Sequence, residues 1–372
     1  MTSIYRTISL KKVALVAAFA VSAGSVALAA DIPVKAAPKV KEVPFFFVND
    51  TSVSYTWYPS WTDPGVAGSS NTVPGGVAGQ RNTFANNQMS FDHFDVWEYG
   101  TNLIHGELDL YGDKDPTQGT PGATGSREFF GFWTGTLGFN ELGHTKAFST
   151  ILTKDVSFML NLTGNTQNNY LAPDLAQVAP GIQFTLNLPG VVDVGITAMK
   201  EWNHNEFDAC DAGGLGDAAI PCAAGGPFSG DRSYEWTWKV FSFISEPLTF
   251  LPDSVPLTWV NILNITGPKG TGISTANCNA IGAGGSCGAP GFMGSSAFTN
   301  NETKTEIFED TRLSLDASKV FWGKPGIWDA YVGYRYWENK FGTNHNAPLF
   351  AAIAPGTSVE STVYLGTTYH FK

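Results

Sequence analysis

The chain has little charge, no long apolar run beyond its first residues, and no recognisable catalytic motif. Only 15% of its residues are charged, against roughly a quarter in soluble domains. Acidic residues outnumber basic ones by 33 to 22, which disfavours binding to nucleic acid or to an anionic surface. We find no nucleophile or His–Asp motif, so we predict no enzyme. No helix is expected to cross a bilayer, because that needs ~20 apolar residues.

The one apolar run lies at the start of the chain. Three basic residues precede an apolar stretch over 13–26, and the small-residue sequence ALA follows at 27–29. This order is typical of a secretory signal peptide, and the run is short for a membrane-spanning helix. We therefore expect residues 1–29 to be removed, which takes away three basic and no acidic residues and moves the formal charge from −11 to −14. Residues 30–46 are expected to form a periplasmic segment, either as a linker or as a plug.

What the chain has in abundance is glycine and aromatic residues, arranged in alternation. It contains 41 Gly, 26 Phe, 12 Tyr and 11 Trp. In the segment 359–371 the odd positions are mostly apolar and the even positions mostly polar. Segments 104–111, 191–202 and 303–316 alternate in the same way, although Glu309 breaks the last pattern. A period of two indicates strands, because helical spacing would mix these charges with the apolar residues.

Two kinds of connection separate the alternating segments. Stretches rich in Gly, Pro, Asn and Ser cover about 59–87, 113–126, 164–180, 203–232, 267–301 and 342–356. Shorter joints lie at 100–102, 139–155, 189–190, 247–255 and 322–326. Together they predict about twelve strands, with long loops at one end and short turns at the other, as in outer-membrane barrels. We predict an all-β fold, a closed antiparallel transmembrane β-barrel over 47–372 with long extracellular loops and short periplasmic turns; a soluble β-sandwich is the alternative.

The stretch YVGYRYWENKFG, residues 331–342, can be oriented by its arginine. A basic side chain facing lipid costs ~2 to 4 kcal/mol near the midplane, so Arg335 is expected to face the lumen. Tyr331 and Trp337 share its parity, whereas Tyr334 and Tyr336 would face lipid. A barrel of twelve strands should enclose a narrow passage in which every solute touches the wall.

Three segments carry a family resemblance. VGYRYWENKFG, followed by a last loop and a final strand, resembles the corresponding region of the nucleoside-specific channel (Tsx-like) outer-membrane family. NDTSVSYTWYPSWTDPG and FDHFDVWEYGTN, with GELDLYG following, are similar to the early strands of that family's relatives. The resemblance implies a twelve-stranded barrel that passes nucleosides along aromatic and ionisable residues. The chain departs from the pattern at its end, where Lys372 follows Phe371, and in two cysteine-bearing insertions.

The expected function is passive uptake of small polar solutes, nucleosides above all, without a cofactor. Aromatic side chains can stack on a base for ~1 to 3 kcal/mol, and carboxylates and Arg can hydrogen-bond sugar hydroxyls. Outer-membrane lipid and the barrel-assembly machinery are the other expected partners. The same charges could instead form a ladder that holds the wall together. The expected lining residues are Glu107, Asp109, Glu235, Lys239, Glu306, Phe308, Asp310, Arg312, Tyr331, Arg335, Glu360 and Tyr364.

Three other functions stay open: a channel for another solute, a structural or surface-recognition barrel, and a barrel hydrolase. A hydrolase would have to draw on Ser90, His93, Asp95 and His105, whose phases in the sequence are too mixed to place them on one face.

The four cysteines fall in two glycine-rich loops. Cys210 and Cys222 share one loop, and Cys278 and Cys287 share the other, so the simplest pairing is local. Export permits disulfides, and each would stabilise the fold by roughly 2 to 4 kcal/mol. The rival is a metal site among the His, acidic and Cys residues of 204–211. Their spacing matches no zinc or calcium loop, so no metal is predicted.

Overall fold

The computed structural model describes most of the unit Pro44–Lys372. The predicted signal peptide, nearly all of the predicted periplasmic segment and the four cysteines lie outside the described residues, so those assignments stay predictions. The described residues are 45–62, 83–112, 126–167, 174–204, 231–270, 303–342, 356 and 358–371.

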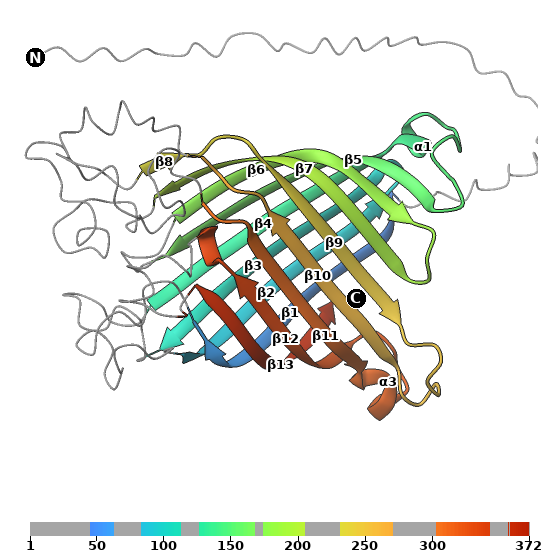
Figure 1. Cartoon of the computed structure of the whole chain (residues 1–372). Helices are drawn as coiled ribbons and strands as arrows, with labels where there is room; N and C mark the ends of the chain where they lie inside the picture. The colour runs from blue at the N-terminus through green and yellow to red at the C-terminus, as the bar shows by residue number, and fades with distance from the viewer. Residues whose placement is uncertain are drawn as a thin grey trace, which may run out of the picture. The chain divides into compact units, whose positions relative to one another are not determined.

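Twelve long antiparallel strands close into a barrel (Figure 1). Their hydrogen-bonded order is β6-β5-β4-β3-β2-β1-β13-β12-β11-β10-β9-β7, and β7 pairs with β6 to complete the circle. One further short strand, β8, extends the ladder at the end of β7. The closed antiparallel barrel confirms the predicted fold class. The strands are β1 Phe46–Trp61, β2 Phe84–Trp97, β3 Gly100–Gly112, β4 Ser126–Gly138, β5 Thr153–Gln167, β6 Asp174–Leu186, β7 Val191–His204, β8 Asp231–Ser233, β9 Thr237–Pro247, β10 Leu257–Thr266, β11 Glu306–Asp316, β12 Trp328–Glu338 and β13 Val359–Phe371.

Short connections gather at one end of the barrel, on the right in Figure 1. They include the two short helices, α1 Phe139–Leu142 and α3 Ala317–Trp322. The turn between β2 and β3 lies at Glu98 and Tyr99, so the joint predicted at 100–102 was wrong by two residues and its residues belong to β3. A 3-10 turn, η2 Lys340–Gly342, follows β12 towards the other end.

The long loop predicted at 164–180 was also wrong, because most of that stretch is strand. β5 continues to Gln167 and β6 begins at Asp174, with only 168–173 between them. The amide of Asn165 donates to Glu128 and its oxygen accepts from the backbone of Leu175. Polar residues of this stretch therefore form hydrogen bonds within paired strands, whereas the composition alone suggested a loop.

Side chains alternate between an apolar outer face and a more polar interior. Along β13, Val363 and Leu365 are 59% and 54% exposed, while Glu360 and Tyr364 are buried. The alternation predicted for 359–371 is confirmed, as is the inward orientation of Arg335, which is 8% exposed. Soluble proteins also expose single apolar side chains, but a continuous outer face of large apolar residues is exceptional for them. This barrel is therefore built for surroundings that are apolar outside its wall.

A repeated Tyr-x-Gly sequence joins β12 to β13. Tyr331 pairs with Gly366, and Gly333 pairs with Tyr364. A Cβ atom added at Gly333 would lie 2.2 Å from the ring of Tyr364, and one added at Gly366 would lie 2.3 Å from the ring of Tyr331. Each tyrosine thus lies over the glycine opposite it, and the missing side chains are what let both rings lie against the wall.

We predict that Gly333→Ala and Gly366→Ala each lower the free energy of unfolding by ~1 to 3 kcal/mol, because the new methyl group overpacks a tyrosine ring. Urea titration of the barrel refolded into lipid measures this. Gly106→Ala is the matched control, since its Cβ would find its nearest neighbour at 3.6 Å. Equal stability of all three variants would contradict the close packing of the rings.

Candidate functional site

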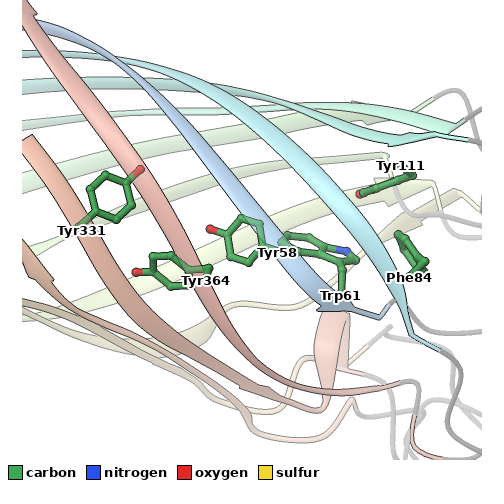
Figure 2. Packing of buried hydrophobic residues seen from close by; sticks show 6 residues of the cluster. All are labelled: Tyr58, Trp61, Phe84, Tyr111, Tyr331 and Tyr364. Atoms are coloured by element: carbon green, nitrogen blue, oxygen red, sulfur yellow. The ribbon is translucent and has the colours of Figure 1, made fainter.

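A row of six aromatic rings runs through the interior of the barrel (Figure 2). The rings come from β12, β13, β1, β3 and β2. Successive ring centroids lie 6.1, 5.0, 5.0, 6.2 and 5.2 Å apart, so each ring contacts the next. In order, the row consists of Tyr331, Tyr364, Tyr58, Trp61, Tyr111 and Phe84.

The rings are almost completely enclosed. Tyr58, Tyr111 and Tyr364 are each only 2% exposed, and Trp61 is 3% exposed. Water therefore hardly reaches these rings, and this stretch of the interior is packed rather than open.

A buried ion pair fixes the middle of the ring row. The Nε of Arg335 donates to Asp310 Oδ2 at 2.9 Å, and the hydroxyl of Tyr364 donates to Asp310 Oδ1. The guanidinium carbon of Arg335 lies 4.8 Å from the ring centroid of Tyr58 and 5.3 Å from that of Trp61. Such charge-assisted bonds and cation–π contacts hold both the cation and the rings in place.

A second buried ion pair, between Lys340 and Glu360, lies beside Trp61 of the ring row. Lys340, in η2, is fully buried; its Nζ donates to Glu360 Oε2 at 2.5 Å and to the carbonyl of Thr62 at 2.7 Å. The same Nζ lies 4.7 Å from the ring centroids of both Trp61 and Trp337. The flanking residues Asn339 and Phe341 have φ of 53° and 57°, a left-handed conformation that costs a non-glycine residue ~1 to 3 kcal/mol. The contacts of Lys340 offset this backbone strain.

The interior arginine on β11 differs from these two cations. The guanidinium carbon of Arg312 lies 4.8 Å from the ring centroid of Tyr331. Its Nε is buried without a hydrogen-bond acceptor, and none of the described residues forms a hydrogen bond or ion pair with its guanidinium group. A buried donor without a partner costs ~1 to 3 kcal/mol.

Carboxylates occupy the other side of the ring row, on β3 and β4. Asp109 accepts from the amides of Asn86 at 2.6 Å and Gln88 at 3.1 Å. Glu128 accepts from the hydroxyl of Tyr111 at 2.8 Å.

A histidine lies between two further carboxylates. His105 contacts Asp92 at 2.7 Å and Glu107 at 3.1 Å. The charges of Glu107 and Asp109 act on Arg335, and the charge of Asp92 acts on Arg312. The row of rings therefore has carboxylates of β2 to β4 on one side. On the other side lie the cations of β11, β12 and η2, of which Arg335 and Lys340 are paired with Asp310 and Glu360.

A separate polar group is formed by residues of β7, β9 and β11 and of the segment that follows β10. Lys269 Nζ pairs with Glu201 Oε2 at 2.7 Å, and both side chains are buried. Lys239 and Glu306 face the same pair and interact electrostatically with it.

The predicted lining residues fall in three places. Glu107, Asp109, Phe308, Asp310, Arg312, Tyr331, Arg335, Glu360 and Tyr364 contact the ring row or its flanking charges. Lys239 and Glu306 belong to the separate polar group around Lys269 and Glu201. Glu235 lies between β8 and β9, and its side chain is exposed.

Much of the site was not predicted from the sequence. Tyr58, Trp61, Tyr111 and Phe84 supply four of the six rings, and Lys340 supplies one of the cations. The inward orientation of Tyr58 could have been predicted, because Tyr58 has the same parity as the polar residues Ser52, Ser54 and Thr56 in the alternating β1 sequence. Trp61 was not, because a register shift between Tyr58 and Trp61 breaks the alternation.

The residues considered for a hydrolase separate onto two faces. His93 pairs with Thr51 and Asp95 on the outer face of β1 and β2, whereas His105 faces inward. Within the described ranges no group of three or more His, Cys, Asp or Glu side chains could hold a metal ion. Among the same residues, no helix has both the length and the apolar character needed to cross a membrane.

Comparisons with known proteins add little. No family model matches the chain, and no curated protein matches its sequence. A solved bacterial polysaccharide outer membrane secretin is 7% identical, covers 87% of this chain and 99% of its own, and has a TM-score of 0.31. The outer membrane protein opdK from Pseudomonas aeruginosa is 10% identical, covers 87% of this chain and 98% of its own, and has a TM-score of 0.24. At such low scores neither likeness carries an argument about this chain.

We predict that Lys340→Met lowers the free energy of unfolding by ~3 to 5 kcal/mol, because it removes one partner of a fully buried ion pair. The double variant Lys340→Met/Glu360→Gln should recover part of that loss. Urea unfolding in lipid is the measurement. The exposed Lys146→Met is the control and should change stability by less than ~0.5 kcal/mol. If Lys340→Met were as mild as Lys146→Met, the ion pair would have no structural role.

Proposed function

We propose that this barrel spans the bacterial outer membrane. Large apolar side chains point away from its interior all round the wall, among them Val53, Trp57, Phe129, Ile196 and Leu365. Exposing them to water would be costly, at roughly 25 cal/mol per Å² of apolar surface. The long strands have 10 to 16 residues, enough for a tilted strand to cross the hydrocarbon core, which takes ~9 to 11.

We further propose that the barrel is a channel for passive uptake of small polar solutes that carry a flat ring, with nucleosides as the expected class. The observation that supports this is the continuous row of interior rings, with carboxylates of β2 to β4 on one side and cations of β11, β12 and η2 on the other. A base or similar ring can stack on aromatic side chains. Hydroxyl groups of the same solute can donate to the carboxylates and accept from the cations.

The enclosed rings set the mode of passage. Because successive ring centroids lie 5.0 to 6.2 Å apart, a flat solute can leave one ring as it meets the next. It must displace side chains to do so, since the rings are nearly covered. Several weak contacts in series allow both entry and exit, whereas one tight site would trap the solute. A small conductance is therefore expected.

The test is single-channel conductance in planar bilayers. The unmodified protein should pass a small current that uridine blocks. Tyr331→Ala should raise the current and weaken uridine block by roughly 5- to 150-fold, the equivalent of ~1 to 3 kcal/mol of stacking. Tyr334→Ala is the matched control, because Tyr334 lies on the same strand, faces outward and is 39% exposed.

Two results would contradict parts of this proposal. Block by another solute but not by uridine would remove the nucleoside assignment and keep the channel. Absence of any current would favour a surface or structural barrel, a candidate that the near-complete burial of Tyr58, Tyr111 and Tyr364 supports.

A further inference from the structure

The interior cations differ in whether they form ion pairs with the protein's own carboxylates. Arg335 is paired with Asp310, Lys340 with Glu360, and Lys269 with Glu201. Arg312 is half-buried, and no described residue forms a hydrogen bond or ion pair with it. A guanidinium group presents five N–H donors in a rigid plane. The N–H donors of Arg312 are therefore available to a solute inside the barrel.

The charges that face Arg312 do not neutralise it. Asp310 and Asp92 are the acidic groups that interact electrostatically with Arg312. Asp310 already accepts from Arg335 and from the hydroxyl of Tyr364. Asp92, across the interior on β2, is in contact with His105. The acidic groups that act on Arg312 are thus engaged elsewhere, and its positive charge is available.

The group beside Arg312 is an aromatic ring. Tyr331 lies under the guanidinium group, and its hydroxyl is held by Thr56 Oγ1 at 2.7 Å. Arg312 is also directly opposite Gly333 on β12, a position without a side chain. An uncommitted cation therefore stands next to a ring whose position is fixed, at one end of the row.

We propose that Arg312 and Tyr331 form a binding station for an anionic group on a ring-bearing solute, so that the channel prefers carboxylate- or phosphate-bearing ring compounds to neutral ones. This rests on the proposed channel function and narrows its solute class. The planar donors of Arg312 match the two oxygens of a carboxylate or phosphate, and Tyr331 and Tyr364 offer the adjoining rings.

The experiment measures block of single-channel current by matched pairs of solutes. Benzoate is compared with benzyl alcohol for the carboxylate, and uridine 5′-monophosphate with uridine for the phosphate. In the unmodified protein, at least one anion should block at a concentration about ten-fold or more below that of its neutral partner. Which pair shows the difference identifies the anionic group.

Arg312→Gln should abolish the difference within a pair while leaving block by the neutral partner within about two-fold. Arg312→Lys should retain part of it, because the charge stays and the planar fork is lost. Lys154→Gln is the matched control: it removes one exposed positive charge from β5, away from the ring row, and should leave the difference unchanged.

The proposal is overturned if anion and neutral partner block equally in both pairs, or if the difference survives Arg312→Gln. Loss of the difference in Lys154→Gln as well would assign it to overall charge and also overturn the station. These outcomes are distinct from failure of the channel itself, in which no solute would alter a current because none would flow. A circular dichroism spectrum of each variant, unchanged from the unmodified barrel, excludes misfolding as the cause.

Discussion

Pairing of β6 with β7 closes the hydrogen-bond ladder and makes the barrel possible. Without it the sheet would have two free edges, and an apolar medium offers no partner for their backbone groups. The seam carries Pro180, which has no N–H, and Gly181, where a Cβ would lie 2.2 Å from the carbonyl oxygen of Ile196. The glycine lets the strands approach beside a residue that cannot donate.

Closure also divides every strand into an inner and an outer set of side chains. Polar and charged residues that a soluble protein would display are enclosed, and there they pair with one another. Most interior cations are committed to carboxylates that hold neighbouring strands and rings in place, as Arg335 is to Asp310. Arg312 differs, because no described residue forms an ion pair with it. That difference is why we propose that Arg312, and not the paired cations, binds a solute.

The sequence predicted the class of fold and the phase of its clearest strands. An unbroken alternation such as that of 359–371 reports the two faces directly, and Arg335 oriented β12 because lipid excludes its charge. Two kinds of feature could not be predicted from alternation. Polar inward residues such as Asn165 look like loop composition until their partners on other strands are known. Register shifts near Trp61 move rings between faces, and contacts such as that of Lys340 with Glu360 join positions that periodicity cannot relate.

The molecule is an inverted barrel, apolar on its outer face and polar with packed rings within. Nitroxide labels placed one at a time along β13, from 361 to 369, and measured in lipid bilayers test it most directly. Collision with dissolved oxygen, which concentrates in hydrocarbon, should be high at odd positions such as Val363 and Leu365 and low at even positions such as Thr362 and Thr368. An accessibility without a period of two, or one that peaks at the even positions, would contradict the account.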